Sequence, residues 1–256
     1  YKRQAFEKSL NLPAVSVLQK VGVPALVRTA RLFRLSEEIP AVPALALGAM
    51  DTTPLDLAAA YAALANGGEL FSPKTYLSVT DGEDEIALFR APDPVSVADP
   101  AAVYVLTNLM QGVLERGTGR AVRRLGFTHP AAGKTGSSSN TRDAWFGGFT
   151  PELATIVWVG FDDNSELGLT GGVAAAPIWT EYMKCAMQFV PPTRFSVPAG
   201  VTYVEIDPAS GARATRRCPR DTTIREVFLR GTEPTRPCPI HSRYAEPQSH
   251  FEQEPQ

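Results

Sequence analysis

The segment between residues 131 and 161 places the strongest constraint on the fold. It contains three short runs of small and apolar residues, 131–136, 145–149 and 154–161, which are separated by polar turns. The second turn, 150–152, is three residues long, which is enough to reverse the chain but too short to cross over a sheet. We therefore expect three neighbouring antiparallel strands that form a meander.

The first of these runs carries a polar sequence, Lys134-Thr135-Gly136, followed by Ser137 and Ser138. The ammonium group supplies charge, the hydroxyl groups donate hydrogen bonds, and the glycine lets another chain lie flat against the strand. Such groups are suited to dock the anionic end of a substrate beside a nucleophile. The alternative is a tight turn with a solvated lysine. The apolar context favours a strand whose polar side chains are open to a cleft.

A second candidate element, Ser9 and Asn11, precedes an apolar stretch over 12–21. A hydroxyl and an amide two residues apart on a loop can face one cleft, where one relays a proton and the other holds a substrate carbonyl. Either residue is also a common helix cap, with Pro13 in the first helical turn. From spacing alone, the cap interpretation is favoured.

The spacing of apolar residues predicts three helices, over residues 54–65, 100–115 and 177–187. Thr53 is suited to cap the first helix, with Pro54 in its first position and Gly67 just beyond its end. The Gly-Thr-Gly sequence at 117–119 lacks the preceding strand and the spacing of a nucleotide-binding loop. We interpret it as a helix-exit turn near the cleft.

Composition limits the domain organisation. A chain of 256 residues with 44% hydrophobic content can bury one sizeable core, or one domain with an appendage. Proline content rises after Val190, so we expect a domain over 1–190 and a Pro-rich extension over 191–256 that packs on it and frays over 252–256. The extension contains a short strand candidate, 202–206.

Charge and hydropathy exclude several classes. The net charge of −2 gives no reason to expect a nucleic-acid partner. No apolar run approaches the length of a membrane span, and the first residues do not resemble a signal peptide. The absence of an initiator methionine suits a fragment or a processed product.

Several segments, in order along the chain, resemble class A penicillin-binding proteins, the bifunctional peptidoglycan synthases. Ser9-Leu10-Asn11 resembles the S-x-N segment of that family, and Lys134-Thr135-Gly136 its K-T-G motif. Further similar segments are 47–61, 65–68, 115–121, 145–147, 218–221 and 225–234. The likeness covers nearly the whole chain.

The resemblance implies an α/β fold of the serine β-lactamase and D,D-peptidase type, with an antiparallel sheet covered by helices on both faces and incomplete on its N-terminal side. It implies a D,D-transpeptidase or carboxypeptidase that cross-links peptidoglycan stem peptides through a serine acyl-enzyme and is acylated by β-lactams. It implies no cofactor and no catalytic metal. The location it implies is the extracytoplasmic, periplasmic face of a bacterial membrane.

The resemblance also assigns roles. Ser9 relays protons to the leaving group, Asn11 holds the amide of the substrate's acyl side chain, and Lys134 supplies positive potential and hydrogen-bonds Ser9. Substrate binding falls to four residues that follow the lysine: Thr135, Gly136, Ser137 and Ser138. Thr135 and Ser137 receive the terminal carboxylate, and the Ser137 N–H forms half of the oxyanion site. Ser137 replaces the more usual threonine.

No serine in the sequence is followed three positions later by lysine, so the family's S-x-x-K nucleophile motif is absent. We favour a downstream part of a larger protein, whose upstream part carries that motif, a glycosyltransferase domain and a membrane anchor. The other interpretations are an isolated half that folds poorly and a non-catalytic sensor of stem peptides or β-lactams. A β-lactamase is the nearest enzymatic alternative.

The three cysteines have different expected states. An extracytoplasmic protein favours a disulfide between Cys218 and Cys238, which would staple a segment with little core of its own. Free thiols are the alternative. A zinc site is a third, but Cys218, Cys238 and His241 supply only three ligands. Cys185 is expected to be a buried small hydrophobic residue.

Overall fold

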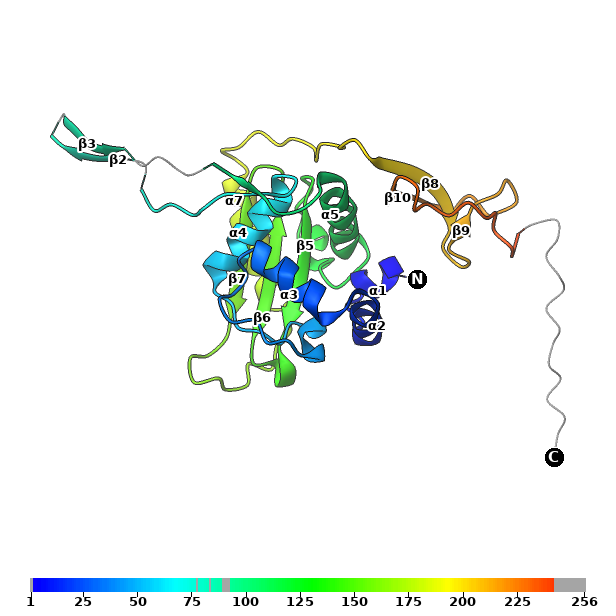
Figure 1. The fold of residues 1–256 in the computed structure, drawn as a ribbon, viewed down its shortest axis with the longest axis horizontal. Helices are drawn as coiled ribbons and strands as arrows, with labels where there is room; N and C mark the ends of the chain where they lie inside the picture. The colour runs from blue at the N-terminus through cyan, green and yellow to red at the C-terminus, as the bar shows by residue number, and fades with distance from the viewer. Residues whose placement is uncertain (1, 77, 83, 89–92, 242–256) are drawn as a thin grey trace. The chain divides into compact units, whose positions relative to one another are not determined.

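A computed structural model gives the structure of the chain and describes residues 2–76, 78–82, 84–88 and 93–241 (Figure 1). The chain divides into two compact units, residues 2–199 and the residues from 200 onward. Each unit has its own three-stranded sheet. The expected domain boundary at residue 190, and the packing of the extension on the domain, stay proposals. Residues 252–256 lie outside the described residues.

The sheet of the first unit is the predicted meander. Strands β5 (Ala132–Ser137), β6 (Ala144–Phe149) and β7 (Ala154–Val159) pair antiparallel in the order β5-β6-β7 (Figure 1). The register sets Lys134 opposite Gly147 and Ser137 opposite Ala144. The Lys-Thr-Gly sequence therefore lies on a strand, as predicted, and this strand is at one edge of the three-stranded sheet.

Helices cover both faces of this sheet, which confirms the predicted fold class. Helices α4 (Pro54–Ala65) and α7 (Ala175–Ala186) both contact β6 and β7. A Cβ atom on Gly147 would meet Tyr61 of α4, whereas one on Gly148 would meet Trp179 of α7. Successive residues of a strand face opposite sides of a sheet, so the two helices lie on opposite faces.

The predicted helices are present, and shifted bounds occur in one of them, since the helix predicted over 177–187 both begins early and ends one residue early, at Ala186. Thr53 caps α4 by accepting a hydrogen bond from Asp56 N at 3.1 Å. Helix α5 (Pro100–Glu115) has the predicted bounds and packs against β5. Helix α7 begins two residues before the predicted residue 177, because proline is tolerated in a first turn, where the backbone N–H groups have no partner within the helix.

The remaining elements of this unit are short. The helices and turns are α1 (Lys2–Glu7), α2 (Asn11–Val21), α3 (Val23–Leu32), α6 (Ala121–Arg124) and the 3₁₀ turns η1 (Pro43–Leu47) and η2 (Ser139–Thr141). The strands form two small antiparallel pairs, β1 (Glu69–Leu70) with β4 (Val95–Ser96), and β2 (Ser78–Asp81) with β3 (Asp84–Leu88). Of the described helices, none is long and apolar enough to cross a bilayer.

The second unit contains strands β8 (Val201–Asp207), β9 (Ala212–Arg213) and β10 (Ile224–Leu229), in the order β10-β8-β9. Strand β8 extends the predicted strand 202–206 by one residue at each end. This part of the chain therefore folds into a sheet of its own and is more than the extended tail that we expected.

Two expectations about cysteines are wrong. Cys218 and Cys238 are free thiols and do not form a disulfide. Their sulfur atoms are instead hydrogen-bonded, Cys218 Sγ with Thr215 N at 3.3 Å and Cys238 Sγ with Asp207 Oδ2 at 2.8 Å. Cys185 is exposed, because it lies two residues beyond Met183 on α7 and so faces away from the buried side of that helix.

Candidate active site

Ser9 lies at the C-terminal end of α1, in a position that usually belongs to glycine. Leu10 N donates to Ala5 O at 2.9 Å and Ser9 N donates to Phe6 O at 3.1 Å, the two bonds that close a helix with a left-handed residue. Ser9 is that residue, with φ of 54°. A side chain in this conformation costs about 1–2 kcal/mol, so the serine is not there for local stability.

The cap interpretation of Ser9 and Asn11 is wrong. Helix α2 begins at Asn11, its N-cap residue is Leu10, and no side chain caps it. Both side chains instead line a cleft. The distinction was open in the sequence because it depends on the backbone angle at Ser9, which no spacing pattern reports.

Glu7 fixes the position of this loop. Its carboxylate is buried and accepts from Arg116 Nη2 at 2.5 Å and from Arg3 Nη1 at 3.2 Å. Its backbone carbonyl accepts from Thr118 N at 3.1 Å. Glu7 thus ties the end of α1, two residues before Ser9, to the end of α5.

Lys134 joins the loop to the edge strand. Its Nζ donates to Ser9 Oγ at 2.8 Å, the hydrogen bond that the resemblance implied, and to its neighbour's carbonyl, Thr135 O, at 3.0 Å. The ring of Phe6 lies 6.0 Å from the ammonium group. Burial lowers the pKa of Lys134 from 10.5 to about 8. The lysine therefore stays mostly protonated at neutral pH but is close to its titration range.

Two further hydroxyl groups of the strand are positioned by neighbours. Thr135 Oγ1 and Thr118 Oγ1 are 2.6 Å apart, so one hydroxyl group donates to the other. The proton of the accepting hydroxyl group remains available to donate to a ligand. Ser137 Oγ accepts from Gly171 N at 3.0 Å, which leaves its own proton free to donate. A Cβ atom on Gly171 would overlap the carbonyl oxygens of Trp145 and Gly136, so only glycine fits there.

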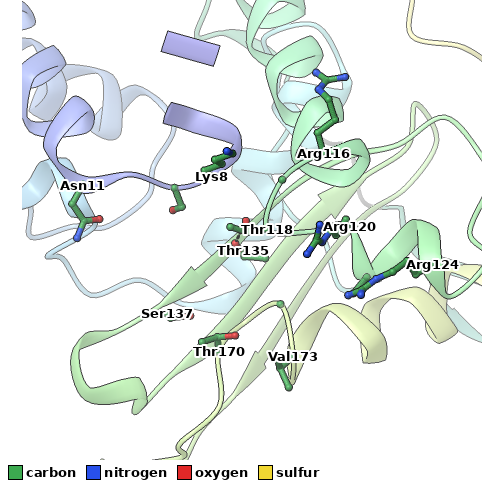
Figure 2. A pocket seen from close by; sticks show the side chains of 14 residues that line it. Lys8, Asn11, Arg116, Thr118, Arg120, Arg124, Thr135, Ser137, Thr170 and Val173 are labelled. Atoms are coloured by element: carbon green, nitrogen blue, oxygen red, sulfur yellow. Dashed lines mark hydrogen bonds between the residues drawn. The ribbon is translucent and has the colours of Figure 1, made fainter. Parts of the chain in front are cut away.

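These groups open into one cleft of about 670 Å³ (Figure 2). Ser9, Asn11, Thr135 and Ser137 line it, together with Thr118, Thr170 and neighbouring backbone. Four cationic side chains also line the cleft: Lys8, Arg116, Arg120 and Arg124. Among the described residues that line it, none is acidic. The cleft is thus suited to an anionic ligand, although the net charge of the chain is −2.

The structure does not place every predicted residue on the cleft wall. Lys134, Gly136 and Ser138 are not among the described residues that line the cleft, although Lys134 contacts Ser9, which does. Ser138 Oγ accepts from Asp143 N at 2.8 Å and so closes the turn between β5 and β6. Substrate binding by Gly136 and Ser138 stays a prediction.

Sequence reasoning missed the cationic lining. The one sequence feature that pointed to this region was the Gly117-Thr118-Gly119 turn, which was expected near the cleft. Gly117 and Thr118 do line the cleft. The arginines on either side of this turn carry no spacing that distinguishes them from a solvated surface. Glu7 was missed because its spacing from Arg3, four residues earlier, is an ordinary pair on a helix surface, and its other ionic partner, Arg116, is 109 residues away.

We expect the Ser9→Gly substitution to raise the free energy of unfolding of this unit by up to about 1 kcal/mol, because glycine adopts the left-handed conformation without strain. Ser9→Ala is the matched control, since it also removes the hydroxyl but keeps a side chain at positive φ. The three tryptophans lie in residues 2–199, so tryptophan fluorescence during urea unfolding reports this unit. A Ser9→Gly protein less stable than Ser9→Ala would contradict the strain argument.

Comparison with known proteins relates this site to an established family. Residues 2–184 match the model of the penicillin binding protein transpeptidase domain, and residues 197–243 match that of the penicillin-binding protein 1A C-terminal domain. The chain is 34% identical to penicillin-binding protein 2D of Bacillus subtilis over 243 residues. That match covers 92% of this chain and 34% of the relative, so the chain spans about a third of the relative's length.

Solved structures give the same relationship. The crystal structure of penicillin-binding protein 1A from Haemophilus influenzae matches with a TM-score of 0.83 and 25% identity, over 92% of this chain and 41% of that one. Penicillin-binding protein A from Mycobacterium tuberculosis, solved as a penicillin G acyl-enzyme complex, matches with a TM-score of 0.60 and 27% identity, over 73% of this chain and 48% of that one. The chain therefore belongs to the penicillin-binding protein transpeptidase family, and its relatives include the class A members.

Proposed function

We propose that this chain supplies one wall of a D,D-transpeptidase site that cross-links peptidoglycan stem peptides. The observation that carries the proposal is the hydrogen bond between Lys134 Nζ and Ser9 Oγ, which joins two elements 125 residues apart beside a cationic cleft. Family membership supports the same reaction. The alternative of a β-lactamase is not favoured, because the matched family model is a transpeptidase domain.

The reaction consists of two acyl transfers. A serine oxygen attacks the carbonyl carbon of the penultimate D-alanine, the peptide bond breaks, and the terminal D-alanine leaves with a proton. An amine of a second stem peptide then attacks the ester carbonyl, forms the new amide and releases the serine with its proton. Each step requires a group that moves a proton and a site that stabilises the oxyanion.

Each cleft residue has a role in this proposal. Ser9 relays the proton to the leaving amine, and Lys134 holds Ser9 and supplies positive potential. Asn11 binds the amide of the acyl side chain. The terminal carboxylate is received by Thr135 and Ser137, with the available proton of the Thr118–Thr135 pair and the Ser137 hydroxyl as donors, and the Ser137 N–H forms half of the oxyanion site. The four cationic side chains of the cleft attract the carboxylate and retain it.

The nucleophile is proposed to lie in a part of the protein upstream of Ser9. No S-x-x-K sequence occurs in the chain, which spans about a third of the length of its Bacillus relative. An upstream glycosyltransferase domain, a membrane anchor and a periplasmic site of action belong to the same proposal. Acylation by β-lactams is supported by the penicillin G acyl-enzyme of the related Mycobacterium protein.

The test is labelling of the purified full-length protein with fluorescent penicillin, followed by proteolysis and mass measurement of the labelled peptide. We expect the label on a serine of an S-x-x-K sequence outside the 256 residues of this chain. A label on a serine within this chain would overturn the assignment, because that serine would lack the lysine three positions later. Absence of label from a folded full-length protein would contradict the proposed reaction.

A further inference from the structure

The second unit contains a cluster of metal-binding side chains far in sequence from the transpeptidase residues. We propose that a single Zn²⁺ ion binds this unit through four side chains: Asp207, Cys218, Cys238 and His241. Their ligand atoms all lie within 4.8 Å of one another. Only three of these ligands could be expected from the sequence, because nothing in it marks Asp207 as their neighbour.

The fold brings the four ligands together from separate segments. Asp207 is the last residue of β8, and Cys218 follows β9, where its N–H donates to Thr215 O at 3.1 Å. The segment that carries Cys238 pairs with β9, since Cys238 N donates to Arg213 O at 2.8 Å and Arg213 N donates to Arg236 O at 3.0 Å. His241 follows three residues later, a separation as short as that between paired ligands in zinc sites.

The distances suit a tetrahedral ion. His241 Nδ1 lies 3.4 Å from Cys238 Sγ and 3.4 Å from Asp207 Oδ2. Ligand atoms around tetrahedral Zn²⁺ are separated by about 3.3–3.8 Å, given metal–ligand bonds of about 2.0–2.3 Å. Cys238 Sγ and Asp207 Oδ2 are closer, at 2.8 Å, because the thiol proton lies between them. Binding of the ion would displace the protons of both thiols and separate these two atoms.

The surroundings of the ligands favour a metal over a disulfide. Asp207, Cys218 and Cys238 are almost completely buried, at 2%, 4% and 0% exposure, whereas His241 leaves one side open for exchange. A disulfide would use the two sulfur atoms and remove the thiol proton that Cys238 donates to the buried Asp207 carboxylate. The four ligands would be two thiolates, an imidazole and a carboxylate. Zn²⁺ binds such nitrogen and sulfur ligands, whereas Mg²⁺ and Ca²⁺ favour oxygen ligands.

The ligands also have supporting contacts. Asp207 Oδ1 accepts from Ala209 N at 3.1 Å, and its Oδ2 accepts from Ser210 Oγ at 3.1 Å. Thr215 N donates to Cys218 Sγ at 3.3 Å. Such contacts orient ligands before an ion binds. Among the residues of this unit that the structure describes, the buried aliphatic side chains are Val201, Ile206 and Val227, so a metal would add the stability that a core of this size lacks.

The test is zinc titration of the complete 256-residue chain after removal of metal by a chelator under reducing conditions. We expect one zinc ion per chain by elemental analysis, with proton release on binding. Hydrogen exchange should slow in peptides from 200–241 and stay unchanged in peptides from 2–199. Cobalt in place of zinc should give the charge-transfer absorption of thiolate ligands.

Variants separate this site from adventitious binding. Cys238→Ser and His241→Ala should each weaken zinc binding at least about 100-fold. If a cysteine variant does not fold, Asp207→Asn, which keeps the size of the side chain, should weaken zinc binding in its place. Cys185→Ser, at an exposed cysteine outside the cluster, should leave the zinc affinity unchanged. Equal zinc affinity in Cys238→Ser would overturn the proposal. So would a purified chain that contains no zinc and has lost two hydrogen atoms of mass to a Cys218–Cys238 disulfide.

Discussion

The Lys134→Met substitution should lower the rate constant for acylation of the full-length protein by penicillin at least about 100-fold, because it removes a charged donor that acts in the reaction. The same change should leave the thermal unfolding temperature of this unit unchanged or raise it. The reason is that burial disfavours the charged lysine and lowers its pKa to about 8, whereas methionine carries no charge to desolvate. Acylation is measured by time-resolved labelling with fluorescent penicillin.

The pH dependence follows from the same pKa. Lys134 is charged below about pH 8, so binding of a carboxylate-bearing β-lactam should be retained there and decline as the pH rises through this value. The folded-state pKa lies below the ordinary value, so the unfolded chain binds more protons between about pH 8 and 10.5, and the folding stability contributed by this group rises in that window. An acylation rate that increases through pH 8 would show that Lys134 acts as a base, contrary to its proposed role.

The Glu7→Gln substitution should lower the free energy of unfolding of the first unit by about 3 kcal/mol, because it leaves two guanidinium groups beside a buried amide. Breaking a fully buried ion pair can cost up to about 5 kcal/mol. The loss of stability here should be smaller, since the Arg116 side chain is 55% exposed. The side-chain ion pairs of Glu7 hold the end of α1 two residues before Ser9, so acylation of the full-length protein should also slow. Urea unfolding followed by tryptophan fluorescence measures the stability change.

Glu115→Gln is the matched control for this prediction. Glu115 pairs with Arg123 at 2.8 Å, but its side chain is 48% exposed, so its removal should cost less than about 1 kcal/mol. Equal losses in the two variants would show that the Glu7 network does not hold the loop more firmly than an ordinary surface pair.

The elements that the sequence predicted share a strong local signal. Helices α4 and α5 were predicted to the residue because Thr53 and Asp99 cap them and a proline follows each cap. The meander followed from apolar runs joined by short turns. The start of α7 was placed two residues late, since Pro177 was taken as the first helical residue although proline is also tolerated later in a first turn.

The site was predictable only where it follows the family motifs. Lys134 and Ser9 were paired through the resemblance, and the structure contains their hydrogen bond. Glu7 and Asp207 were missed because only the tertiary fold brings Arg116 to Glu7, and Cys238 and His241 to Asp207. The cysteine pairing was wrong because the spacing of the thiols in the sequence cannot show that a carboxylate and an imidazole lie within 4.8 Å of the two sulfur atoms.

The central claim is that the cleft belongs to a transpeptidase, and penicillin labelling alone does not separate an enzyme from a sensor. The direct measurement is mass analysis of a D-Ala-D-Ala-terminated stem peptide after incubation of the full-length protein with an acceptor amine. We expect free D-alanine and a new amide between the two peptides in equal amounts, and neither in the Lys134→Met protein. A full-length protein that is acylated by penicillin but releases no D-alanine would contradict the claim.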